Sequence, residues 1–389
     1  MKSLKFLNRN TQIKYVALFL FAVFILASCQ DEVLQENNIT NTKSLKHETN
    51  PNETYAFNGT VYDISAAPDG SIMVAVNGAD SKTIQVIRNG QVKTMATIDA
   101  ASSIQGIASI GSGNAFVTAG GTDLAQNGEL YKVSNGNAKI VADLAAFERN
   151  NDPDAFEGLQ WKNQLCEAID GFSAGPQNNP YKVTVLDDDT TLLADAAGNT
   201  ILYATTEGVV DYKAILSPPL SEEGNYLVRW YTGEDESIEC YVQPVPTSVA
   251  VGPDGYIYIG ELTGALAEGV PIGRSRIWKL PADATHAVCD EESPVGDCNV
   301  LINGLTSVID VEIGPDGMLY VVELDENSWF SLFGIPGLPP IGGTISRYHL
   351  DGTFDASVTN LSLPGAITFD KKGNLWVLEN LNTVKVLNF

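Results

Sequence analysis

Residues 249–259 read Val-Ala-Val-Gly-Pro-Asp-Gly-Tyr-Ile-Tyr-Ile, two apolar runs joined by a tight turn. A similar motif occurs at 311–321, Val-Glu-Ile-Gly-Pro-Asp-Gly-Met-Leu-Tyr-Val, and at 64–74, Ile-Ser-Ala-Ala-Pro-Asp-Gly-Ser-Ile-Met-Val. Glycine accepts the positive φ that such a turn requires, so each phrase predicts a β-hairpin. The fold is therefore expected to repeat this hairpin along the chain.

Weaker copies of the phrase complete a set of six, spaced roughly 45 to 75 residues apart. They lie at 107–113, 183–189 and 367–373. Second hairpins follow, with turns visible at 89–90, 135–136, 207–208 and 351–352. Two hairpins make a four-stranded blade, and six blades around an axis make a propeller. We predict an all-β fold, a six-bladed β-propeller over residues 53–389; an irregular β-sandwich would not explain the six-fold repetition.

The two ends of this domain are expected to meet. The chain stops after the third strand of the sixth copy, at 383–387, so one strand is missing there. Residues 54–59, Thr-Tyr-Ala-Phe-Asn-Gly, look like the fourth strand at 300–304, Val-Leu-Ile-Asn-Gly. We therefore predict that residues 54–58 form the outer strand of the last blade and close the ring.

The first 28 residues have the composition of an export signal. Four basic residues precede an apolar run at 15–27, which is short for a membrane-spanning helix. The run ends in Leu26-Ala27-Ser28-Cys29, which resembles the bacterial lipobox cut before a diacylated cysteine. We predict a signal peptide over 1–28, lipidation of Cys29 and attachment to a membrane through that lipid.

The residues after Cys29 are expected to be a tether. Residues 29–52 are rich in Asn, Thr, Glu and Lys and poor in large apolar side chains, so they cannot form a core. Gln30-Asp31-Glu32 resembles the surface-export signal of lipoproteins in the Bacteroidetes. This resemblance implies an outer-membrane lipoprotein at the cell surface, with the periplasmic face as the alternative.

Net charge limits the class of binding partner, and the cysteine content predicts disulfides. Cleavage would remove four basic residues and leave 19 basic against 48 acidic, a net charge of −29. Such a charge argues against nucleic acid as a binding partner, because phosphate neutralisation needs Lys and Arg in excess. Cationic partners, including metal ions, stay open. We expect the protein to be a monomer. Export favours disulfides. Cys289 and Cys298 would close a local loop, and by elimination Cys166 would pair with Cys240.

Several longer phrases carry a resemblance to a known family. They are residues 142–148 with 151–154, 179–181, 194–199, and 246–264 with Arg276-Ile-Trp278. In these phrases the chain resembles the ScyD/ScyE family, named for proteins of scytonemin biosynthesis and widespread in bacteria. The resemblance implies a propeller related to NHL-repeat proteins and leaves the chemistry open. The stretches 217–243 and 331–340 depart from it as insertions.

Aligning the six copies on their turn position brings acidic residues into register. Six residues after the turn, at the end of the second strand, stand Asp195, Glu261, Glu323 and Glu379. The same face of a propeller would receive the residues just before each first strand, namely Asp63, Tyr181, Thr247, Ser248 and Asp310. Like charges that converge at a channel mouth need a cation or raise one another's pKa.

We therefore predict a ligand- or ion-binding propeller. Carboxylates, hydroxyls and carbonyls without imidazole suit Ca²⁺, so the four carboxylates are the metal candidates and the other five residues are the ligand candidates. The same acids could instead cap the loops between second and third strands, or face water.

Two other functions stay open at this point. The first is a metal-dependent hydrolase or lactonase of the gluconolactonase type, in which a carboxylate acts as general base on metal-bound water. The second is a surface scaffold that binds protein or glycan, with Trp230-Tyr231 and Trp329-Phe330 as exposed aromatic groups that could stack on sugars.

Overall fold

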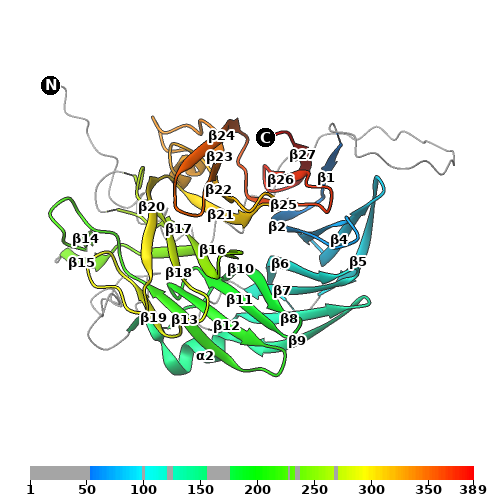
Figure 1. The fold of residues 1–389 in the computed structure, drawn as a ribbon, viewed down its shortest axis with the longest axis horizontal. Coiled ribbons are helices and arrows are strands. Elements are labelled where there is room, and N and C mark those ends of the chain that lie inside the picture. Colours follow the sequence, from blue (N-terminus) through cyan, green and yellow to red (C-terminus); the bar gives the residue numbers. More distant parts are fainter. Residues whose placement is uncertain are drawn as a thin grey trace.

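The computed structural model describes residues 53–98, 101–120, 126–155, 176–226, 228–232, 237–266 and 270–389. Within these residues the chain forms six antiparallel sheets of four main strands each, arranged as the blades of a ring (Figure 1). The predicted six-bladed β-propeller is confirmed.

The first three blades each run outward from the centre of the ring through four consecutive strands. Blade 1 is β2 (Thr60–Ala66), β3 (Ile72–Asn77), β4 (Lys82–Arg88) and β5 (Gln91–Thr97). Blade 2 is β6 (Ser103–Gly111), β7 (Asn114–Gly120), β8 (Glu129–Ser134) and β9 (Asn137–Asp143). Blade 3 is β10 (Pro180–Asp187), β11 (Thr190–Asp195), β12 (Thr200–Thr205) and β13 (Val210–Leu216).

The last three blades follow the same plan. Blade 4 is β16 (Pro244–Val251), β17 (Tyr256–Thr263), β18 (Ser275–Pro281) and β20 (Asn299–Leu305). Blade 5 is β21 (Val308–Ile313), β22 (Leu319–Glu323), β23 (Gly343–Tyr348) and β24 (Phe354–Leu361). Blade 6 is β25 (Ala366–Phe369), β26 (Leu375–Glu379), β27 (Thr383–Leu387) and, from the other end of the chain, β1 (Thr54–Ala56).

The remaining elements lie in the connections. Helix α2 (Leu144–Asn151) and the 3₁₀ helix η1 (Pro153–Ala155) follow blade 2. A separate hairpin, β14 (Val228–Thr232) with β15 (Ser237–Tyr241), precedes blade 4. Strand β19 (Ala287–Cys289) and the 3₁₀ helix η3 (Trp329–Phe333) belong to the connections inside blades 4 and 5.

The hairpin between first and second strands depends on glycine. Gly70, Gly113, Gly255, Gly317 and Gly373 hold the turn position of five blades, with φ between 77° and 86°. A side chain at such a φ is strained, which explains why the phrase repeats with the same glycine. The six copies found in the sequence are therefore the six inner hairpins of the propeller.

The hydrophobic core is divided among the blade interfaces. Six large clusters of buried apolar side chains lie between the blades of the described chain, one between each pair of neighbours, including the pair formed by the last and the first, and a small seventh cluster joins Ile215 and Val288. One example joins Met73 and Ile84 of blade 1 to Ile107 and Val117 of blade 2. The second strands are buried almost throughout, whereas the outermost strands, such as β5 and β9, are largely exposed, so the apolar contacts between blades stabilise the ring.

The N-terminal strand closes the ring, as predicted. β1 pairs antiparallel with β27, with Thr54 opposite Lys385 and Ala56 opposite Thr383. The strand is shorter than expected, since it ends at Ala56, but the contact continues because Phe57 N–H donates to Asn382 O at 2.9 Å. Phe57 is buried in the cluster between blades 6 and 1.

One of the two predicted disulfides is described. Cys289 and Cys298 are bonded, with their Cα atoms 4.7 Å apart. The bond ties the end of β19 to the residue before β20, and β19 itself pairs in parallel with β13 of blade 3. Cys166 and the side chain of Cys240 lie outside the described residues.

The N-terminal predictions concern residues that the structure does not describe. Residues 1–28, the lipidation of Cys29 and the tether up to residue 52 remain expectations from the sequence. Among the described residues, no helix has the length and apolar character needed to cross a bilayer.

Candidate functional site

The centre of the propeller holds a hydrophilic cavity. Strands β2, β6, β10, β16, β21 and β25 lie nearest the middle of the ring (Figure 1) and supply its lining. The cavity has a volume of about 250 Å³. Its polar lining residues are Asp63, Ser65, Ser109, Lys182, Thr184, Ser248, Asp310, Glu312 and Thr368. Three carboxylates therefore share this space with one lysine.

Lys182 reaches across the channel from blade 3. Its Nζ lies 3.0 Å from Asp63 Oδ1 in blade 1 and 2.9 Å from Asp310 Oδ2 in blade 5. The same ammonium donates to the carbonyl oxygen of Gly365, just before β25, at 3.3 Å. An ammonium has three donors, and each of them here has an acceptor from a different blade.

The two aspartates also bind the backbone of the next blade. Asp63 Oδ2 accepts from Ile107 N–H at 2.9 Å, and Asp310 Oδ2 accepts from Ile367 N–H at 2.9 Å. These bonds join blade 1 to blade 2 and blade 5 to blade 6. The predicted mouth residues Asp63 and Asp310 are thus brought together, and their partner is a lysine that the sequence did not identify as part of the site.

Burial and neighbouring charge set the protonation of this network. The pKa of Asp63 is raised to about 6. Burial is the largest cause, the charge of Lys182 opposes it, and the charge of Asp310 adds to it. Burial alone would lower the pKa of Lys182, but Asp310 and Asp63 together raise it above its usual value. Lys182 is therefore charged at neutral pH, because it lies between two carboxylates.

Glu312 lies two residues along β21 from Asp310, so it faces the same cavity. Its side chain makes no hydrogen bond or ion pair with the described residues. The pKa of Glu312 is raised to about 8. Burial is the largest cause, the charges of Asp310 and Asp63 add to it, and the charge of Lys182 opposes it. At neutral pH Glu312 carries a proton and presents both a donor and an acceptor to the cavity.

The other three predicted mouth residues differ in their surroundings. Ser248 is buried in the cavity lining, and its hydroxyl has no partner among the described residues. The Thr247 hydroxyl lies 3.0 Å from Val308 O and 3.2 Å from Gly260 O, so it joins blade 4 to blade 5. Tyr181 packs against Tyr62 with ring centroids 6.2 Å apart.

The four carboxylates at the ends of the second strands occupy equivalent positions, as the alignment predicted, and each has its own partners. Asp195 Oδ1 accepts from the N–H groups of Asn179, Ala197 and Gly198 at 2.6–3.2 Å. Glu261 is buried and accepts two hydrogen bonds from Arg276, both 2.9 Å long. Trp278 Nε1 donates to the same Glu261 carboxylate at 2.6 Å.

The remaining two carboxylates also accept bonds near their own strands. Glu323 Oε1 accepts from Thr306 N–H at 2.6 Å, and burial raises its pKa to about 7. Glu379 accepts from Ser362 N–H and pairs with Lys385. Asp195 thus caps the loop between second and third strands, which is the structural alternative that the sequence left open. Glu261 instead binds side chains of β18, and Glu323 and Glu379 accept from the connections between blades.

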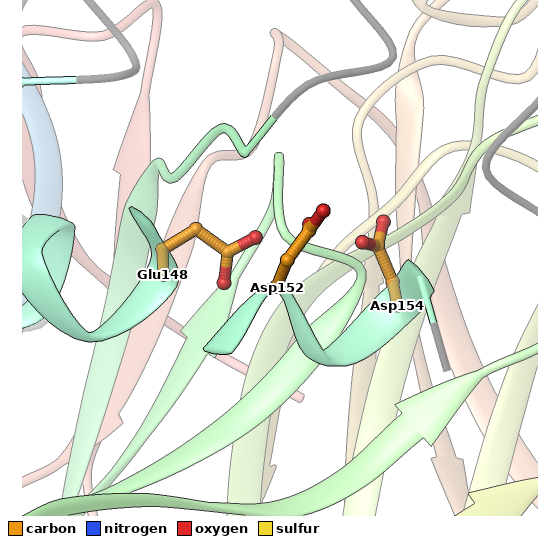
Figure 2. A group of neighbouring side chains, drawn as sticks. All are labelled: Glu148, Asp152 and Asp154. Carbon is orange, nitrogen blue, oxygen red and sulfur yellow. The ribbon is translucent and has the colours of Figure 1, made fainter. Parts of the chain in front are cut away.

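A different group of acids has the spacing of a metal site. Glu148, Asp152 and Asp154 offer carboxylate oxygens that all lie within 4.8 Å of one another (Figure 2). In the part of the chain that the structure describes, this is the one such group of His, Cys, Asp or Glu side chains. None of the four predicted metal candidates belongs to it, and none of the three lines the central cavity.

The aromatic pair proposed for sugar stacking in blade 5 is not exposed. Trp329 is buried, stacks on Phe330 with ring centroids 3.9 Å apart, and donates from Nε1 to Thr263 O at 2.9 Å. The prediction of an exposed Trp329 is wrong, because helix η3 folds the insertion back onto the blade interface. The side chains of Trp230 and Tyr231 lie outside the described residues.

Comparisons with known proteins concern the fold. No protein-family profile and no curated sequence matches the chain. Solved structures similar to it include a catalytically inactive virginiamycin B lyase from Staphylococcus aureus with quinupristin, at 14% identity and a TM-score of 0.44, covering 84% of this chain and 81% of that one. Another is a gluconolactonase from Xanthomonas campestris, at 11% identity and a TM-score of 0.46, covering 86% and 88%. A third is the PQQ-bound aldose sugar dehydrogenase from Streptomyces coelicolor, at 9% identity and a TM-score of 0.47, covering 86% and 96%.

Proposed function

We propose that this protein is a binding propeller of the bacterial cell envelope that takes a small, polar, positively charged molecule in its central channel. The observation that carries the proposal is Glu312, a carboxyl group in the cavity without a hydrogen-bond partner among the described residues. Glu312 is half-buried, and a carboxyl group in such a place gains from a ligand that replaces the water it has lost. A second unpartnered polar atom, Ser248 Oγ, lines the same cavity.

Charge selects the class of ligand. Three carboxylates and one lysine line the cavity, so an amine or ammonium ion is favoured there over an anion. A cation near Glu312 would lower its pKa and favour the ionised form, which strengthens the hydrogen bond between them. The hydroxyl groups of Ser65, Thr184 and Thr368 add positions that can bind polar groups of the ligand.

The placement in the envelope and the family membership belong to the same proposal. They are supported by the signal-like N-terminus with Cys29 and by the phrases that resemble the ScyD/ScyE family. Two of those phrases, 151–154 and 194–199, meet in space, because Asn199 Nδ2 donates to Asp154 Oδ2 at 2.9 Å.

Metal-dependent hydrolysis is less well supported than binding. A metal ion in the channel would have to lie among Asp63, Asp310 and Glu312, but the Lys182 ammonium already bridges the first two. The acidic side chains with metal-ligand spacing lie outside the cavity lining. A panel of lactones tests this alternative: turnover that a chelator abolishes would favour the hydrolase.

The binding proposal is tested by a thermal-shift screen of the full chain, purified in detergent. The panel contains polyamines and amino sugars, neutral sugars of the same size, and sugar acids. We expect at least one amine to raise the melting temperature, since a ligand that binds only the folded state stabilises it. The Glu312→Gln variant should show a clearly smaller shift at the same amine concentration.

The matched control is Glu207→Gln, which removes one exposed carboxylate of blade 3 far from the cavity lining. It should respond to the amine as the unmodified chain does. A panel in which only acids shift the melting temperature would contradict the proposal, and so would an amine shift that is equally large in Glu312→Gln.

A further inference from the structure

The connection between blades 2 and 3 gathers negative charge at one point. Glu148 comes from the last turns of α2, Asp152 follows the helix directly, and Asp154 lies in η1. Figure 2 shows the three side chains side by side along this turn. Glu148 and Asp154 are buried, and Asp152 is half-buried. Three carboxylates in so small a space repel one another when all are ionised, and a cation bound by their oxygens would offset that repulsion.

The local sequence places these side chains by its capping residues. Asp143 begins α2, since its carboxylate accepts from Ala146 N–H at 2.8 Å. Leu144 and Glu148 lie one turn apart on the same buried face of the helix. Asp152 then takes a left-handed conformation, with φ 45°, and ends the helix by donating its N–H to Glu148 O. Pro153 starts η1, which turns Asp154 back toward Glu148.

A second element brings buried oxygen atoms to the same place. Asn199, in the loop between β11 and β12, donates from Nδ2 to Asp154 Oδ2 at 2.9 Å and to Gln243 Oε1 at 2.6 Å. Its other amide atom, Oδ1, is buried and has no partner among the described residues. Asp195 begins the same loop and is fully buried, and its Oδ2 likewise has no partner there.

Asp195 is close enough to the cluster to feel its charge. The pKa of Asp195 is raised to about 6. Burial is the largest cause, the N–H groups around Oδ1 oppose it, and the negative charge of Asp154 adds to it. Because Oδ1 accepts all three N–H groups, Oδ2 is the atom left for another ligand. A buried carboxylate oxygen and a buried amide oxygen therefore accompany the three acids.

We propose that Glu148, Asp152 and Asp154 bind a Ca²⁺ ion, with Asn199 Oδ1 as a further oxygen ligand and Asp195 as a neighbouring carboxylate. Ca²⁺ takes six to eight oxygens at about 2.4 Å, so ligands on opposite sides of the ion are about 4.8 Å apart. The three carboxylates lie within that distance of one another. A donor set of carboxylate and amide oxygens, without His or Cys, favours Ca²⁺ over Zn²⁺.

The ion would fasten the α2–η1 connection to the β11–β12 loop. The three acids precede blade 3, whereas Asn199 belongs to it, so the ion joins segments more than 40 residues apart in the chain. This site is separate from the channel, and its existence does not depend on the binding function proposed for the cavity.

The test is isothermal titration of Ca²⁺ into the full chain in detergent, after treatment with EDTA, with Mg²⁺ titrated in parallel. We expect one Ca²⁺ per chain, weaker binding of Mg²⁺, and a melting temperature that rises with Ca²⁺. Asp154→Asn and Asp152→Asn should each weaken Ca²⁺ binding about tenfold or more, because affinity depends on the number of charged ligands.

Two features of the design keep the result decisive. Asparagine adopts the left-handed conformation of residue 152 as readily as aspartate, so Asp152→Asn preserves the fold. Asp188→Asn removes an exposed carboxylate of the same blade and should bind Ca²⁺ as the unmodified chain does. The absence of Ca²⁺ binding in the unmodified chain would overturn the proposal, as would undiminished binding in Asp152→Asn.

Discussion

Lys182 stands seven residues before the turn position of its blade, where blades 1 and 5 carry Asp63 and Asp310. At this position of the repeat, three blades therefore contribute one cation and two anions to the middle of the ring. Such a network is costly to form without all its members, because each buried charge must be compensated by the others. Single substitutions in it are informative for that reason.

Replacing Lys182 by Met should strongly destabilise the propeller. The change leaves Asp63 and Asp310 without their common cation, and breaking a buried ion pair in this way costs about 3–5 kcal/mol. Urea denaturation followed by tryptophan fluorescence measures the loss. Adding Asp63→Asn and Asp310→Asn to Lys182→Met should recover part of the stability; a single variant as stable as the unmodified chain would contradict the role of Lys182.

The pH dependence of stability should report Glu312. Its pKa of about 8 in the folded protein lies above the ordinary glutamate value of 4.5, so the folded state binds the proton more tightly than the unfolded state. The stabilisation is complete below about pH 4.5 and is lost as the pH rises through 8. Glu323, with a pKa of about 7, adds to the same trend.

We therefore expect the melting temperature to fall between pH 5 and pH 9, and the fall to be smaller in Glu312→Gln by about 2 °C or more. The experiment is a series of thermal melts at constant ionic strength. Identical pH profiles for the two proteins would show that Glu312 ionises normally in the folded state.

At the scale of elements, the sequence repeat predicted the strands and turns of the blades, but not the hydrogen-bond partners of individual side chains. The hairpin phrase located all six blades and set Asp195, Glu261, Glu323 and Glu379 at equivalent strand ends, because strand period and turn type are local properties. The same alignment contains Lys182 and Glu312, seven and five residues before their turns, so these could have been found.

Other features depend on contacts that sequence spacing does not reveal. Glu261 pairs with Arg276 from β18, and only the register of β17 against β18 makes them opposite residues. Glu148, Asp152 and Asp154 become a cluster because Asp152 ends α2 in a left-handed conformation. Trp329 is buried because η3 packs back onto the blade interface.

Strand β19 links two blades and depends on a disulfide. It leaves blade 4, pairs with β13 of blade 3, and is held to the start of β20 by Cys289–Cys298. The double variant Cys289→Ala/Cys298→Ala should lose about 2–3 kcal/mol of unfolding free energy, as expected for a short closed loop. Urea denaturation of both proteins without reductant measures it, and equal stability of the two proteins would contradict the role of this bond. A remaining effect of reductant on the double variant would report the predicted Cys166–Cys240 pair.

At the scale of the whole molecule, stability depends on closure of the ring. The last blade is completed by β1, and the cluster between blades 6 and 1 includes Phe57 and Trp376. Both ends of the domain are therefore held by the same sheet (Figure 1). Without β1, strand β27 would present an unpaired edge.

Deleting residues 53–59 should lower the melting temperature by several degrees or more, because it removes the β1 pairing and the buried Phe57 side chain. Differential scanning calorimetry provides the measurement. Deleting residues 30–52, the predicted tether, is the control and should leave the melting temperature unchanged. A deletion of 53–59 with an unaltered melt would mean that the ring does not need this strand.

The central claim is that the channel binds a small cation through Glu312, and proton release tests it most directly. The amine that gives the largest thermal shift is titrated at pH 7 in buffers of different ionisation enthalpy. We predict that binding releases close to one proton per ligand, because Glu312 is protonated in the free protein and ionised beside a cation. Glu312→Gln should bind about tenfold more weakly and release none. Binding without proton release, or release that persists in Glu312→Gln, would contradict the account.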